Sequence, residues 1–133
     1  MPDIRHLVFI KSSADNIYSA ITTKEGIAAW WSPHNNAKNE VGFTFRISFG
    51  GDYYKEIRIK ELKPNEYVEW EITHAHPEWL NTTVTFSITI KNGKSELRFG
   101  HNNWSDYTDL FAQCTHDWGV FLEYLKEYCE IDS

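Results

Sequence analysis

Between residues 41 and 102, apolar and polar side chains alternate in five separate runs, and this feature limits the possible folds most strongly. The runs are VGFTFRISF, YYKEIRIKEL, YVEWEITH, TTVTFSITI and SELRFGHN, and residues typical of turns separate them. A period of two buries one face of a strand and leaves the other in solvent. Because the Asn-Gly of KNGK is a strong hairpin signal, the sequence predicts an antiparallel sheet whose strands are joined mainly by hairpins.

The predicted inward face of these runs is apolar and aromatic, and it includes two histidines. Its members are Val41, Phe43, Phe45, Ile47, Phe49, Tyr53, Ile57, Ile59, Val68, Trp70, Ile72, His74, Val84, Phe86, Ile88, Ile90, Leu97, Phe99 and His101. Aromatic residues make up 16% of the chain and charged residues 24%, a balance typical of a water-soluble body around an aromatic interior.

Helix signals lie on both sides of the alternating runs. A β-rich run at residues 4–10 leads into KSSADN, which carries residues typical of a helix start. Apolar positions then repeat at helical spacing in ADNIYSAITT and in TKEGIAAWW, with a break at residues 22–24. The sequence therefore predicts a strand followed by two short helices.

The last segment is predicted to form one long amphipathic helix after a cap at Thr108. Its apolar stripe contains Phe111, Cys114, Trp118, Phe121, Leu122 and Leu125. The order of elements indicates an α+β fold, with helices on one face of an antiparallel sheet of about six strands. Since no long polar linker interrupts the 133 residues, we expect one domain over residues 1–133.

Two adjacent tryptophans, Trp30 and Trp31, end the second short helix. Together with Ile27 they stand at i, i+3 and i+4 and can cover one surface, and Pro33 stops the helix. Adjacent helical positions point about 100° apart, so we expect one ring to be buried and the other to lie closer to solvent.

Charge and hydropathy exclude two classes of partner. The net charge is −6 and no cluster of Lys and Arg occurs, so a nucleic acid backbone would be repelled. No apolar run reaches the roughly 18 residues of a membrane span.

Cys114 and Cys129 would lie roughly 22 Å apart on one helix, too far for a disulfide. Free thiols fit a reducing compartment, and we expect a cytoplasmic protein.

The order of elements resembles the helix-grip fold of the SRPBCC superfamily, which includes StAR-related lipid-transfer domains and birch-pollen-allergen-like proteins. The likeness is greatest to the branch of homologues of the activator of heat-shock-protein ATPase (AHSA-like). Two segments carry it: SADNIYSAITTKEGIAAWWSP, with its terminal Trp pair, and CTHDWGVFLEYLKEYCE in the final helix. The resemblance implies a curved sheet that grips the C-terminal helix, with an apolar cavity between them. It also implies a link to the stress response. Members range over carriers, cyclases and co-chaperones, so function must be argued from the site.

The candidate site combines inward-facing aromatic and histidine residues with residues of the long helix, because apolar walls with a few polar groups are usual in small-molecule pockets. The candidate ligand-binding residues are Trp30, Trp31, Phe45, Tyr53, Trp70, His74, Phe86, Phe99, His101, Phe111, His116 and Trp118. The alternative is that the aromatic residues only fill the core. We expect His74, His101 and His116 to orient a ligand by hydrogen bonds.

Metal and catalytic sites are weakly supported by the sequence. His74 and His76 could bind a metal only if His101 or His34 joined them, and no thiol or carboxylate completes a known spacing, so no metal and no cofactor are expected. His74, His101, His116 and Asp117 are the sensible candidates for a general acid or base, but neighbouring helix positions cannot form a triad. We expect no catalytic residue, and an enzyme is the less favoured interpretation.

Three functions follow, in order of preference. The first is binding of a small hydrophobic or amphipathic molecule between the sheet and the C-terminal helix. The second is a co-chaperone-like interaction with a heat-shock ATPase, through exposed aromatic residues of WWSPHNN and HPEWLN; the alternative is that these Trp residues are lids of the cavity. The third is a polyketide cyclase-like enzyme.

Overall fold

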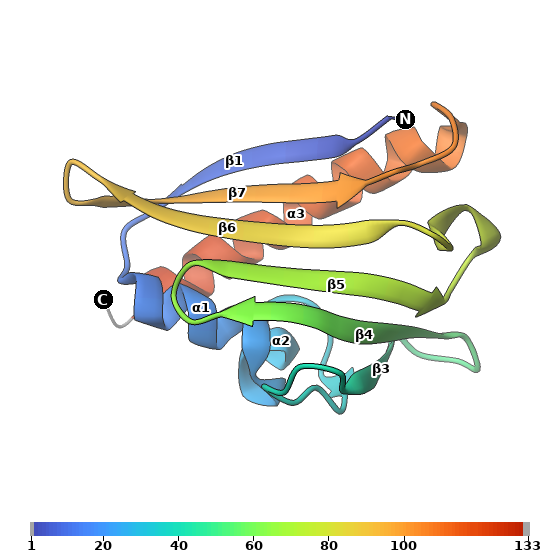
Figure 1. Ribbon diagram of the computed structural model, residues 1–133, viewed down its shortest axis with the longest axis horizontal. Coiled ribbons are helices and arrows are strands. Elements are labelled where there is room, and N and C mark those ends of the chain that lie inside the picture. Colours follow the sequence, from blue (N-terminus) through green and yellow to red (C-terminus); the bar gives the residue numbers. More distant parts are fainter. Residues whose placement is uncertain (1, 132–133) are drawn as a thin grey trace.

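The computed structural model describes residues 2–131, which form one curved antiparallel sheet with helices against one of its faces (Figure 1). The long C-terminal helix crosses this face, and the two short helices pack beside it. The elements are β1 (Ile4–Ile10), α1 (Ala14–Thr22), α2 (Lys24–Trp30), β2 (His34–Asn35), β3 (Thr44–Ser48), β4 (Tyr54–Lys63), β5 (Tyr67–His74), a 3₁₀ turn η1 (Pro77–Trp79), β6 (Thr83–Lys91), β7 (Lys94–Asn102) and α3 (Asp109–Glu130).

The predicted α+β helix-grip fold is confirmed. The sheet has seven strands in the order β1-β7-β6-β5-β4-β3-β2, where about six were predicted. The additional strand is β2, which has two residues and pairs with the end of β3. A strand of two residues is too short to show alternation, so the sequence gives no signal for it.

The junction between α1 and α2 forms where the sequence predicts a break. Thr23 is both the last cap of α1 and the first cap of α2, and its Oγ1 accepts a hydrogen bond from the Gly26 N–H at 3.0 Å. The helices touch so closely here that a Cβ on Gly26 would lie 2.5 Å from the backbone oxygen of Ala20. The same oxygen accepts a 2.8 Å hydrogen bond from the Trp30 indole N–H, which fixes the angle between the helices.

Both tryptophans of the pair are buried, so the prediction that one lies closer to solvent is wrong. Trp30 is 2% exposed and Trp31 6% exposed. Trp31 is the residue that caps the end of α2, and its ring stacks between Trp30 and Trp70, with centroids 5.8 and 5.6 Å away. The two rings can point about 100° apart and still both be buried, because a second layer of aromatic residues covers the outer ring.

Most of the predicted inward face is confirmed, including the buried rings of Phe45, Trp70, Phe86 and Phe99. The apolar stripe of α3 packs on them, with Trp118, Leu122 and Leu125 buried. Cys114 and Cys129 lie on this helix as free buried thiols, as predicted.

His74 lies on the outer face of the sheet, contrary to the prediction. Glu56 pairs with His74, but its neighbour Ile57 pairs with Ile72, so Thr73 is an extra residue in β5. Such a bulge reverses the side chain alternation beyond it. His74 is therefore exposed, and its ring stacks on Tyr54 at 4.7 Å.

Two other inward placements are wrong because the residues lie where no helix covers the sheet. Val41 precedes β3, Ile90 lies at the β6–β7 hairpin, and both are more than half exposed. Phe49 follows β3 and is about half exposed, although its ring reaches the site described below. His116 was placed among the residues facing the sheet, but its side chain is 72% exposed because it lies outside the buried stripe of α3.

Candidate functional site

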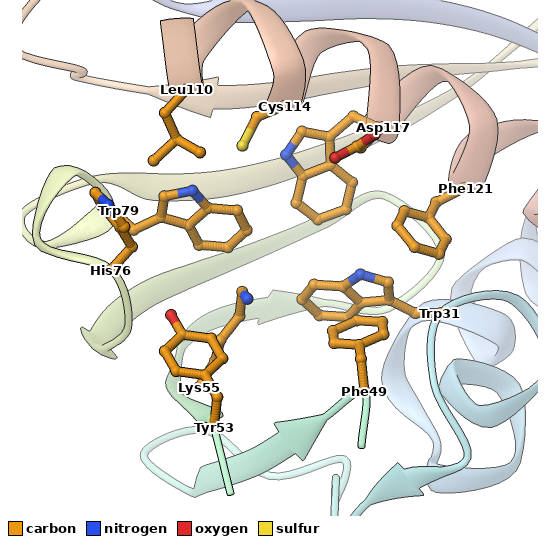
Figure 2. A pocket seen from close by; sticks show the side chains of 11 residues that line it. Trp31, Phe49, Tyr53, Lys55, His76, Trp79, Leu110, Cys114, Asp117 and Phe121 are labelled. Atoms are coloured by element: carbon orange, nitrogen blue, oxygen red, sulfur yellow. The ribbon is translucent and has the colours of Figure 1, made fainter. Parts of the chain in front are cut away.

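A cavity of about 400 Å³ lies between the first half of α3, the segment around η1 and the start of β4. Figure 2 shows the side chains that surround it. They are Trp31, Phe49, Tyr53, Lys55, His76, Trp79, Leu110, Cys114, Asp117, Trp118 and Phe121. Volumes of about 300 to 1,000 Å³ are typical of sites for small molecules, and the aromatic walls fit such a site.

One wall consists of tilted and edge-on rings from three segments of the chain, which are the end of α2, the residues after β3, and α3. Trp31 contacts Trp118 of α3 at 5.2 Å and Phe49 at 5.9 Å. Phe49 in turn contacts Phe121 at 5.9 Å, where the cavity meets solvent. Because Trp31 is backed by Trp30 and Trp70, this wall is held by the core and presents a rigid apolar surface.

The second wall is Trp79, whose ring was predicted to be exposed in a loop. It is buried, so this expectation is wrong. Its ring stacks on Trp118 at 6.1 Å and meets His101 edge-on at 4.6 Å. The η1 turn, which has Pro77 in its first turn, folds the loop back so that the indole points into the protein. The polar residues of this loop predict that it is exposed, but burial of a single indole can hold such a loop against the protein.

Lys55 supplies the positive charge of the cavity. Its Nζ lies 4.8 Å from the ring centroids of Tyr53 and Trp79 and 5.5 Å from that of Phe49. Figure 2 shows the ammonium pointing into the space between these rings, while Asp117 lies on the helix opposite. Desolvation lowers the pKa of Lys55, and the nearby thiol of Cys114 acts in the opposite direction to a smaller extent.

Lys55 is not among the predicted site residues, although the sequence carries a signal for it. Lys55 lies between the predicted inward residues Tyr53 and Ile57 at the same two-residue spacing, so an inward-facing Tyr53 and Ile57 require an inward-facing Lys55. A lysine at an inward position of a strand is unusual enough to mark a site.

His101 lies behind the cavity and is fully buried. The Trp118 indole N–H donates to its Nδ1 at 3.1 Å, so the neutral ring carries its proton on Nε2. Nε2 lies 2.9 Å from Thr82 Oγ1 and donates to it, and the Thr82 hydroxyl donates to the backbone oxygen of Trp79. Desolvation, and to a smaller extent the charge of Lys55, lowers the pKa of His101 to about 3.

This hydrogen-bonded chain occupies both nitrogens of His101 with protein partners. The expected role of His101 in orienting a ligand therefore has no free donor or acceptor to use. The chain instead joins β7, α3 and the loop that carries Trp79, and so it positions two walls of the cavity.

The predicted site residues fall into three groups. Trp31, Tyr53 and Trp118 line the cavity. Trp30, Phe45, Trp70, Phe86, Phe99 and His101 lie in the core, where they support it. The remaining three lie elsewhere: Phe111 packs on Trp104 and Tyr107, and His74 and His116 are exposed.

Among residues 2–131, no three His, Cys, Asp or Glu side chains gather in a way that could hold a metal ion. In the same part of the chain, no helix is long and apolar enough to cross a membrane.

Fold and cavity together define a helix-grip protein with a site of ligand size between its sheet and its last helix. Residues 11–130 match the family model for activator of Hsp90 ATPase homolog 1-like proteins, and the chain belongs to this family. The predicted resemblance to the AHSA-like branch is thereby confirmed. A search of curated proteins gave no match.

Solved structures agree with this assignment. The solution structure of the Aha1 dimer from Colwellia psychrerythraea is 34% identical, with a TM-score of 0.90 and 98% of each chain covered. A crystal structure of the protein MLL2253 from Mesorhizobium loti is 22% identical, with a TM-score of 0.85 and 95% of each chain covered. DynU16, a putative protein in the dynemicin biosynthetic locus, is 21% identical with a TM-score of 0.81; the match covers 98% of this chain and 48% of DynU16. The last two likenesses show the fold alone.

Proposed function

We propose that the protein binds a small hydrophobic or amphipathic molecule in the cavity between the sheet and α3. The observation that carries this proposal is the cavity of about 400 Å³ with Trp31, Trp79 and Trp118 in its walls. Contact between apolar walls of this kind and water is unfavourable in free energy. A ligand of matching size removes this cost by displacing the water. The two free cysteines favour a reducing compartment, so we place this activity in the cytoplasm.

The test is binding of Nile red, an uncharged dye whose fluorescence rises in apolar surroundings. We expect saturable binding with one site per chain, together with a change in tryptophan fluorescence because three indoles line the cavity. A Cys114→Phe variant should lose the site, since the added ring occupies the cavity that Cys114 lines.

Val120→Phe is the matched control. It adds a similar ring on α3 at an exposed position outside the cavity, and it should bind the dye as the parent does. Dye binding that does not saturate, or that survives Cys114→Phe in a folded variant, would contradict the proposal.

The second candidate function is interaction with a heat-shock ATPase, which membership of the family favours. Its test is a direct binding measurement between the purified protein and an Hsp90, with ATP hydrolysis as the readout. Stimulated hydrolysis without saturable dye binding would place this function first.

A further inference from the structure

We propose that the cavity selects an amphipathic monocarboxylic acid, with the apolar body against the aromatic walls and the carboxylate paired with Lys55. This inference rests on the proposed function, because it names the class of molecule that the same cavity accepts.

The first step is the state of the Lys55 ammonium. Among the ion pairs of residues 2–131, none includes Lys55, while seven other lysines and arginines of β1–β7 and their loops are paired with carboxylates. Its neighbours are the rings of Tyr53, Trp79 and Phe49. Ring faces attract a cation but accept no strong hydrogen bond from its three N–H groups. A carboxylate in the cavity would supply the missing acceptor.

The second step asks whether the nearby carboxylates already have hydrogen-bond partners, because an unpartnered carboxylate would favour a cationic ligand. Asp117 accepts a 3.0 Å hydrogen bond from Gln113 Nε2 and lies 3.6 Å from His116 Nδ1. Glu78 accepts a hydrogen bond from the Thr108 hydroxyl. Both carboxylates therefore already have protein partners on the helix side, whereas the cation on the sheet side has none. The site is complementary to an anion rather than to a cation.

The third step concerns the number of charges on the ligand. Lys55 is the only lysine or arginine among the residues that line the cavity. One compact ammonium suits a single carboxylate, whereas phosphates are usually held by several cations or by a planar guanidinium.

His76 offers a second hydrogen-bond donor at the cavity. Its Nδ1 accepts a hydrogen bond from the Glu78 N–H at 3.1 Å, so the neutral ring carries its proton on Nε2.

The experiment compares two probes of nearly equal size, 1-naphthylacetate and its uncharged amide 1-naphthylacetamide, by calorimetry and by displacement of Nile red. The naphthalene ring fits the aromatic walls in both probes, so they differ in charge alone. We expect the acid to bind roughly tenfold or more tightly than the amide, as for a hydrogen bond to a charged group. Dodecanoate and dodecanol repeat the comparison and distinguish an aliphatic from an aromatic body.

Variants of Lys55 assign the preference to this residue. Lys55→Met keeps an apolar stem of similar length and should bring the two affinities within about twofold, whereas Lys55→Arg should keep the preference for the acid. Lys60→Met is the matched control, because Lys60 is an exposed lysine of the same strand, and it should bind both probes as the parent does. Thermal melting of each variant checks that it is folded.

The outcomes separate this inference from the proposed function. Saturable Nile red binding without a preference for the acid, or with a preference that persists in folded Lys55→Met, overturns the carboxylate assignment and leaves the cavity as a binding site. Failure of Nile red itself to bind overturns both.

Discussion

At the scale of single residues, the site depends on two basic residues with opposite roles, the buried His101 and the half-buried Lys55. His101 is neutral and all its polar atoms have protein partners, so it serves the structure. Lys55 has no carboxylate partner among the described residues, so its amino group is available to a ligand. Residues kept in a state that stability alone does not favour are common at functional sites.

His101 makes the stability of the protein sensitive to acid. Its pKa is about 3 in the folded protein, against 6.5 for an ordinary histidine, so between these values only the unfolded state binds the proton. The free energy of unfolding should therefore decrease as the pH falls through this range, by about 1.4 kcal/mol per pH unit from this residue. Urea denaturation between pH 6 and pH 4.5 measures it, with His101→Gln as the comparison. Equal slopes for parent and variant would mean that His101 titrates normally.

At the scale of elements, the short helices could be predicted because residues that cap helices stand at their ends in the sequence. Ser13 and Thr23 accept hydrogen bonds from backbone N–H groups at the starts of α1 and α2, and Thr108 does so for α3, as the sequence indicated. The bulge at Thr73 could not be predicted, because it arises from pairing with β4 and no local residue marks it. That one inserted residue moved His74 out of the predicted site.

Gly26, at the α1–α2 junction, should be the helical glycine of the described chain at which substitution by alanine destabilises the fold most. A Cβ at Gly26 would fall 2.5 Å from the Ala20 backbone oxygen, which cannot move without separating the helices. We expect Gly26→Ala to lower the free energy of unfolding by about 2 kcal/mol, since the steric cost exceeds the gain in helix propensity. Chemical denaturation measures this change.

Gly119→Ala in α3 is the matched control. Its Cβ would meet only the His6 ring, at an ordinary contact distance of 3.5 Å. Helix propensity then dominates, and the variant should be more stable by about 0.5 to 1 kcal/mol. The steric account of the junction fails if both substitutions have the same sign.

At the scale of the whole molecule, alternation and amphipathicity were sufficient to predict the layers, but the cavity depends on contacts that no single segment encodes. Trp79 reaches the core because the η1 loop folds under α3, and Trp31 is covered because Phe49 and Phe121 close over it. These contacts join residues that are distant in the sequence and lie in different elements, beyond the range of any periodicity. Trp31, Tyr53 and Trp118 were predicted as site residues and line the cavity. Of the lining residues that were not predicted, Lys55 could have been recognised from its two-residue spacing to Tyr53 and Ile57.

Because the cavity lies between α3, the β3–β4 segment and the η1 loop, a ligand there should stabilise the whole fold and not one element. A ligand that binds only the folded state adds about 2.7 kcal/mol of stability at a concentration one hundred times its Kd. For a protein of this length, that corresponds to a rise in Tm of roughly 10 °C. Calorimetric melting with 1-naphthylacetate at that excess measures the shift, and Cys114→Phe should show none because its cavity is filled. A Tm that rises equally in parent and Cys114→Phe would place the bound molecule elsewhere on the protein.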